Sequence, residues 1–125
     1  MVTYQVGDFL IRIKNSAKAK KREVSTETSK AKLAVAKVLK KEGFLSEVSE
    51  KDGKLNVTLA YAHKEPVLMN LKLVSKPGLR IYVKSTDIAD HKGGSIFVVS
   101  TPRGVVSSKE ALKLGNGGEL IAEVW

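Results

Sequence analysis

Cysteine is absent from this chain, and histidine is scarce. Without cysteine the chain forms no disulfide and offers no thiolate to a metal, which fits a reducing compartment. The only histidines are His63 and His91, and neither has a metal-ligand spacing or stands beside a nucleophile motif. His91 follows Asp90 and could mimic a catalytic dyad, but in a polar loop such a residue is more often a solvated imidazole. We therefore expect no enzyme activity, no metal site and no cofactor.

Long hydrophobic runs are also missing. Hydrophobic residues make up 42% of the 125 residues, yet no apolar stretch is long enough to span a bilayer. The N-terminus lacks the apolar segment and cleavage site of a signal peptide. We expect a cytoplasmic protein with no membrane partner, built around one compact core or two small cores that share an interface.

Acidic residues are scarce in one part of the chain. Residues 12–41 contain eleven lysines and arginines but only two acids, Glu23 and Glu27, so this segment alone carries a net charge of +9. The other residues contain eleven basic and eleven acidic side chains, so the excess charge of the chain lies in this segment. Such a segment favours a polyanionic partner, although the basic run at residues 18–22 could also be a solvated connection.

Residues 1–64 predict a basic α/β domain. The first helix has one apolar face, which consists of Val6, Phe9, Leu10, Ile13 and Ala17. The polar segment at residues 23–28 could include an edge strand. Ser29 is the expected N-cap of a second helix that runs through Glu42, and Gly43 followed by Phe44 suits a Schellman ending. The apolar face of this helix consists of Ala31, Ala34, Val35, Val38 and Leu39.

The pattern changes from helical to alternating after the second helix. Two alternating segments flank Asp52-Gly53, which predicts a β-hairpin. Pro66 is expected to end strand pairing, so the charged segment at residues 64–66 is the predicted boundary between two domains.

Residues 65–125 predict a β-rich domain. Its expected strands are residues 67–73, 79–83, 96–99 and 120–124. Pro77-Gly78 suits a type II turn, after which Leu79 should face inward. Residues 85–92 form a polar excursion with one helical turn, and the strand at 96–99 should be buried on both faces. Arg80 and Tyr82 should share an exposed face, where they could contact RNA or form an ordinary surface pair.

Residues 100–119 hold turn and capping signals with no apolar core pattern. Pro102 and Gly104 suit a tight turn that points the hydroxyls of Ser100 and Thr101 outward. Such a surface suits phosphate and 2′-hydroxyl groups.

The second part of this stretch predicts a short helix. Ser107 and Glu110 fit a capping box at its start, and Gly115 fits its end. Gly117-Gly118 would then let backbone N–H groups approach a ligand without interference from a Cβ.

Several motifs resemble one known family. They are Ser100-Thr101, Gly104, Glu110-Ala111, Gly117-Gly118-Glu119, the segment DFLIRIKN at residues 8–15, Glu42-Gly43-Phe44, and the segment SKPGLRIY at residues 75–82. Their order and spacing over nearly the whole chain are similar to those of bacterial ribosomal protein S eight, the eighth protein of the small subunit. The chain departs from the family pattern at Pro102, Ser108 and Leu112.

The resemblance implies a structural constituent of the small ribosomal subunit. It implies that the protein binds the central domain of small-subunit ribosomal RNA directly, helps its assembly, lies near the fifth small-subunit protein, and in some bacteria represses its own operon messenger RNA. The residues implied for specific contacts are Tyr82, Ser100, Thr101, Arg103, Gly104, Gly117, Gly118 and Glu119. Glu119 could accept a hydrogen bond from RNA or orient the loop. The residues expected at phosphates are Arg12, Lys14, Asn15, Lys30 and Lys37.

The expected fold is therefore α+β with two small α/β-type domains. The first, residues 1–64, is helix-strand-helix-hairpin, and the second, residues 65–125, is mostly antiparallel β with one short helix and recognises RNA. An alternative is a non-ribosomal protein-interaction module that binds through an edge strand. Its binding would lack the steep salt dependence of phosphate neutralisation.

Overall fold

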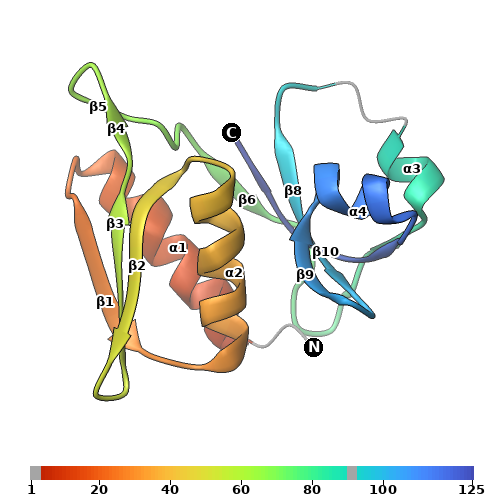
Figure 1. Cartoon of the computed structure of the whole chain (residues 1–125), viewed down its shortest axis with the longest axis horizontal. Coiled ribbons are helices and arrows are strands. Elements are labelled where there is room, and N and C mark those ends of the chain that lie inside the picture. Colours follow the sequence, from red (N-terminus) through yellow and green to blue (C-terminus); the bar gives the residue numbers. More distant parts are fainter. Residues whose placement is uncertain (1–3, 90–92) are drawn as a thin grey trace.

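The chain forms an α+β fold in a computed structural model that describes residues 4–89 and 93–125 (Figure 1). This confirms the expected fold class. The helices are α1 (Tyr4–Lys18), α2 (Lys30–Lys41), α3 (Ser85–Ala89) and α4 (Ser108–Leu114). The strands are β1 (Glu23–Glu27), β2 (Leu45–Lys51), β3 (Lys54–Leu59), β4 (Tyr61–Ala62), β5 (Glu65–Pro66), β6 (Leu71–Leu73), β7 (Tyr82–Val83), β8 (Ile96–Thr101), β9 (Gly104–Ser107) and β10 (Gly118–Val124).

The N-terminal half is a three-stranded antiparallel sheet covered on one face by two helices. Its strand order is β1-β3-β2, so β1 is an edge strand as expected. Asp52 and Gly53 both have positive φ, which is the backbone of the hairpin turn that the sequence predicts. The five apolar residues expected on one face of α1 are all buried. Figure 1 shows α1 and α2 between this sheet and the C-terminal strands.

Both ends of α2 form as the sequence predicts. The Ser29 hydroxyl accepts a hydrogen bond from the Lys32 N–H at 3.1 Å, which satisfies one of the unpaired donors of the first turn. At the other end, Gly43 has a φ of +90°. The N–H groups of Gly43 and Phe44 donate to the carbonyls of Lys40 and Leu39, which is the Schellman pattern.

The expected role of Pro66 is wrong. Pro66 pairs with Tyr61 in a small hairpin of β4 and β5, and its neighbour Val67 donates to the Ala60 carbonyl at 2.9 Å. A proline lacks an N–H but is tolerated in a strand where no donor is needed. The turn of this hairpin consists of His63 and Lys64, both at positive φ.

The C-terminal sheet is built around β10. Its order is β6-β10-β8-β9, and β7 also pairs with β10. The predicted strand at residues 67–73 is wrong in its first half, because only Leu71–Leu73 pairs and Met69 is 71% exposed. The N–H groups of Met69 and Asn70 both donate to the Trp125 carbonyl, so two successive residues share one acceptor, as in a β-bulge.

Other expectations for the second half are met in part. Gly78 has positive φ and Lys76 bridges to Leu79, which confirms the turn, but Leu79 is 61% exposed rather than inward-facing. Leu79 lies in the turn, where it bridges to Lys76, and precedes the two-residue strand β7, so it is outside the paired sheet. The helical turn predicted within residues 85–92 is α3, and residues 90–92 lie outside the described part. At the start of β8, Ile96 and Phe97 are only partly buried.

One cluster of buried apolar side chains joins the two halves. It includes Phe9, Leu10 and Leu39 from the N-terminal half and Val98 and Ile121 from the C-terminal half. A smaller cluster, formed by Ile88, Val99 and Ala111, lies under α3 and α4. The division into domains at residues 64 and 65 stays a prediction, and the larger core crosses that boundary. No helix among the described residues is long and apolar enough to cross a membrane.

Candidate nucleic-acid interface

Three of the predicted contact residues form one row across the C-terminal sheet. Glu119 of β10 lies opposite Tyr82 of β7 on one side and opposite Ser100 of β8 on the other. Tyr82 is 69% exposed, Ser100 is half-buried and Glu119 is only 6% exposed. The row therefore presents an aromatic ring and a hydroxyl group beside a buried carboxylate.

The Glu119 carboxylate has a partner inside the protein. A guanidinium nitrogen of Arg80 donates to it at 3.4 Å, and the side chains of Arg80 and Glu119 are 28% and 7% exposed. The pair neutralises a buried negative charge that would otherwise repel phosphate. This geometry favours the alternative in which Glu119 orients the surrounding residues.

The hydroxyl of Thr101 does not point outward, so that expectation is wrong. Thr101 is 9% exposed, and its Oγ1 donates to the Gly104 carbonyl at 2.8 Å and accepts from the Arg103 N–H at 3.1 Å. These bonds close the two-residue turn between β8 and β9, because a threonine hydroxyl can bond to backbone groups two and three residues further on. Pro102, Arg103 and Gly104 are exposed at the tip.

The two glycines before Glu119 are required by the protein itself. A Cβ on Gly117 would lie 2.2 Å from the Val83 carbonyl oxygen, and a Cβ on Gly118 would lie 2.1 Å from the Ser100 carbonyl oxygen. Any side chain at either position would force β7 or β8 away from β10. The sequence predicted a close approach here, but the group that approaches in this structure is the protein backbone.

The helix α4 begins and ends at the predicted residues. The Ser107 hydroxyl accepts from the Glu110 N–H at 3.2 Å, and Gly115 ends the helix in the left-handed conformation at φ +69°. The reciprocal half of the capping box is wrong, because the Glu110 carboxylate accepts from the Lys41 ammonium of α2 instead. A second ion pair joins α4 to the end of α2, between Lys109 and the C-cap residue Glu42 at 3.9 Å.

A groove between α2 and the C-terminal sheet brings the two predicted classes of residue together. It has a volume of about 320 Å³, and we call it the Lys30 groove. Lys30 from α2 lines it together with Ser100 of β8 and Gly104 of β9. Apolar side chains, including Val35 and Ile121, form its other walls. An expected phosphate contact therefore lies beside two expected specific contacts.

The predicted residues of α1 lie apart from this groove. Lys14 is half-buried and lines a different cavity, next to β6. The Arg12 guanidinium donates to the Ser25 carbonyl of β1 at 2.9 Å, and Asn15 is exposed. Lys37 is exposed on α2 and does not line the Lys30 groove.

Sequence reasoning missed two features of this region. Lys32 is only 8% exposed, and its ammonium donates to the Thr26 hydroxyl at 3.3 Å and to the Glu27 carbonyl at 3.0 Å. One of the eleven basic residues of the charged segment is therefore structural. The strand β9 was also missed, although Val105 and Val106 pack partly buried against the two cores, so residues 100–119 do contribute to the interior.

Among residues 4–89 and 93–125, no group of three or more acidic or histidine side chains is placed to hold a metal ion. The Asp90-His91 pair lies outside these residues. The described surface carries exposed lysines and an exposed tyrosine, with hydroxyl and glycine positions next to them.

The chain is similar to known proteins over nearly its whole length. The family model described as Ribosomal protein S8 matches residues 5–125. A protein from Roseiflexus castenholzii is 44% identical over 96% of this chain and 96% of its own length. Proteins from Caldanaerobacter subterraneus subsp. tengcongensis and Nitratidesulfovibrio vulgaris are 43% and 40% identical over 100% of this chain and over 99% and 100% of their own lengths. All three are called small ribosomal subunit protein uS8. The chain thus belongs to the ribosomal protein S8 family, which is not an enzyme family.

Proposed function

We propose that this protein is a structural constituent of the small ribosomal subunit that binds the central domain of small-subunit ribosomal RNA directly and helps its assembly. Its membership of the ribosomal protein S8 family supports the ribosomal role. The Lys30 groove is the observation that carries the RNA-binding role, because it places a cation beside a hydroxyl group and an exposed glycine. Phosphate contacts position a nucleic acid, and short polar groups next to them can read 2′-hydroxyls and base edges.

Two surfaces have different roles in RNA binding: one attracts RNA of any sequence, and the other distinguishes between RNAs. The exposed lysines of α2, Lys30 and Lys37, attract RNA of any sequence through its phosphates. The row of Tyr82, Glu119 and Ser100, together with the turn between β8 and β9, supplies discrimination. Tyr82 offers an aromatic face on which an unpaired base can stack. The proposed partner is a structured RNA, because a shallow surface with hydroxyl groups and an exposed tyrosine suits 2′-hydroxyls and unpaired bases.

The role of the backbone in this surface follows from Thr101 and the glycines. Thr101 and Gly118 contribute indirectly, by holding the exposed groups in place, because the Thr101 hydroxyl bonds within the turn and Gly118 packs against the backbone of Ser100. Arg103 and Gly104 are exposed at the tip of the turn, where RNA can reach them. Contacts with the fifth small-subunit protein and repression of the operon messenger RNA remain predictions from the family resemblance.

A binding experiment with two transcripts tests the proposal. The purified protein is titrated into a transcript of the central domain of small-subunit ribosomal RNA and, separately, into an equally long transcript from another domain, at physiological salt. We expect much tighter binding to the central domain and a steep log-linear loss of affinity with salt for both transcripts. Equal affinity for the two transcripts, or for duplex DNA of the same length, would contradict the proposal.

The matched control compares two lysines. Lys30→Gln should weaken binding to both transcripts and lower the salt slope by about 0.7 to 0.9, because one phosphate fewer is neutralised. Lys64→Gln removes an exposed charge in the turn between β4 and β5, which lies at the opposite end of the N-terminal half from the start of α2 in Figure 1, and should leave the slope unchanged.

A further inference from the structure

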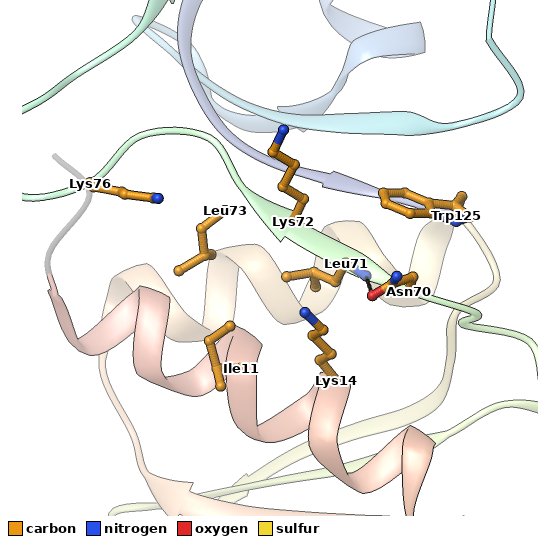
Figure 2. A pocket seen from close by; sticks show the side chains of 8 residues that line it. All are labelled: Ile11, Lys14, Asn70, Leu71, Lys72, Leu73, Lys76 and Trp125. Carbon is orange, nitrogen blue, oxygen red and sulfur yellow. Dashed lines mark hydrogen bonds between the residues drawn. The ribbon is translucent and has the colours of Figure 1, made fainter.

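A second cavity lies between α1 and β6, away from the Lys30 groove. It has a volume of about 410 Å³, and we call it the Trp125 groove. Its floor is aliphatic and consists of Ile11 from α1 and Leu71 and Leu73 from β6. Figure 2 shows Trp125 at one end and Lys76 at the other, with Lys14 pointing from α1 toward β6.

The charged side chains that line this groove have one sign. The charged residues that line it are Lys14, Lys72 and Lys76, and no acidic side chain is among its described lining residues. In Figure 2 the Lys72 side chain points away from Leu71 and Leu73, so Lys14 and Lys76 are the cations directed at the groove. An aliphatic floor between two cations complements a segment that carries apolar and acidic side chains.

The backbone of β6 can accept a further strand along its outer edge. Among the described residues, this strand lies at the edge of the sheet and pairs with β10 alone. Asn70 exchanges hydrogen bonds with Trp125, and the Val74 N–H donates to the Ile121 carbonyl, so by antiparallel alternation the backbone groups of Leu71 and Leu73 point to the open edge. One of these groups is already bonded, because the Leu71 N–H donates to the side-chain Oδ1 of Asn70 at 2.8 Å.

An exposed apolar patch continues the groove. Met69 is 71% exposed and Trp125 is 38% exposed, and the two residues are joined by the bond from the Met69 N–H to the Trp125 carbonyl. Exposed apolar groups beside an edge strand are a liability unless a partner covers them.

We propose that the Trp125 groove is a docking site for an extended, acidic segment of a neighbouring protein. The segment adds to the edge of β6, its aliphatic side chains rest on Ile11 and Leu73, and its carboxylates meet Lys14 and Lys76. This inference rests on the proposed function, since the neighbour belongs to the same ribosomal subunit. A protein segment fits better than RNA because the floor is aliphatic and the open strand edge offers backbone groups to another strand. The geometry thus assigns Lys14 to a carboxylate rather than to a phosphate.

Site-specific crosslinking in assembled small subunits tests the docking site. The photoreactive residue p-benzoylphenylalanine replaces Met69 in one variant and Tyr82 in another, and the crosslinked fragments are identified by mass spectrometry and RNA sequencing. The position of Met69 should crosslink to a protein fragment with more acidic than basic residues, and the position of Tyr82 should crosslink to ribosomal RNA. Crosslinking at position 69 to RNA, to a basic segment, or to nothing while position 82 reacts would overturn the inference.

This experiment distinguishes a failure of the docking site from a failure of the proposed RNA-binding function. An absence of RNA crosslinks at position 82 would count against the proposed function, whatever position 69 reports. The yield at position 69, normalised to the protein present in subunits, should fall several-fold with Lys76→Glu. It should stay unchanged with Lys18→Glu, because Lys18 is an exposed α1 lysine outside the groove.

A synthetic peptide of the captured segment gives the final check. Trp125 is the only tryptophan of the chain, so its fluorescence reports occupation of the groove. The peptide should shift this fluorescence with the wild-type protein and bind several-fold more weakly to the Lys76→Glu variant. A peptide whose acids are replaced by lysines should bind more tightly to the Lys76→Glu variant than to the wild type. If each peptide bound the wild type and the Lys76→Glu variant with the same affinity, charge recognition at Lys76 would be excluded.

Discussion

The backbone of Gly118 lies so close to Ser100 that a Cβ on the glycine would be 2.1 Å from the Ser100 carbonyl oxygen. This approach joins β10 to β8 at the point where Glu119, Tyr82 and Ser100 share a row. The geometry of the proposed recognition surface therefore depends on a residue that has no side chain.

Gly118→Ala should destabilise the protein. Because the added methyl group meets backbone atoms rather than a flexible side chain, we expect a loss of about 1 to 3 kcal/mol in the free energy of unfolding. Urea denaturation measures it. Gly94→Ala is the matched control, since no atom of the described residues lies within 4 Å of a Cβ there, and it should be nearly neutral. Equal stability of the two variants would show that β8 and β10 adapt freely.

Thr101→Val should loosen the turn between β8 and β9. The variant keeps the side-chain shape but removes the hydroxyl that bonds to the Gly104 carbonyl and the Arg103 N–H, so the free energy of unfolding should fall by about 1 kcal/mol. Amide hydrogen exchange at Arg103 should become faster. Thr101→Ser retains the hydroxyl and should exchange like the wild type. Unchanged exchange in the valine variant would mean that other contacts hold the turn.

The ion pair of Arg80 and Glu119 should show energetic coupling. A double-mutant cycle with Arg80→Met and Glu119→Gln should give a coupling of about 1 kcal/mol or more, because Glu119 is nearly buried and its charge is left without this partner when Arg80 is removed. Chemical denaturation of the four proteins supplies the cycle. A coupling near zero would mean that each side chain acts independently of the other.

Two neighbouring lysines of α2 should separate stability from binding. Lys32→Met removes the bonds to Thr26 and Glu27, so it should lower stability by about 1 to 3 kcal/mol and leave the salt slope of RNA binding unchanged. Lys30→Gln should leave stability nearly unchanged, since Lys30 is exposed, and should lower the salt slope. Denaturation and salt titration of both variants check this. A lower salt slope for Lys32→Met would mean that Lys32 also contacts phosphate.

Local signals in the sequence predicted much of the fold. Ser29, Gly43 and Gly115 act on backbone groups within a few residues, and each has the predicted role. The features that were missed depend on distant partners. Met69 is exposed because two successive N–H groups turn toward the Trp125 carbonyl, which no local pattern encodes.

The candidate site shows the same division. Glycines and a threonine marked residues 100–119 as unusual, but the sequence could not distinguish a backbone that approaches RNA from one that approaches another strand. The positions of Val83 and Ser100 opposite Gly117 and Gly118 arise only when β7, β8 and β10 pair. The structural role of Lys32 is hidden in the sequence for a similar reason, since its partners lie in the preceding strand.

The division between attraction and discrimination is tested most directly by the ratio of two affinities. This ratio, central-domain transcript over an equally long unrelated transcript, is measured at one salt concentration for the wild type, Lys37→Gln and the double variant Ser100→Ala with Tyr82→Ser. We expect Lys37→Gln to weaken both affinities equally and keep the ratio. The double variant, if its melting temperature is preserved, should lower the ratio several-fold while binding to the unrelated transcript stays nearly constant. A ratio that is unchanged in the double variant, or that falls in Lys37→Gln, would contradict the assignment of discrimination to the row of Tyr82, Glu119 and Ser100.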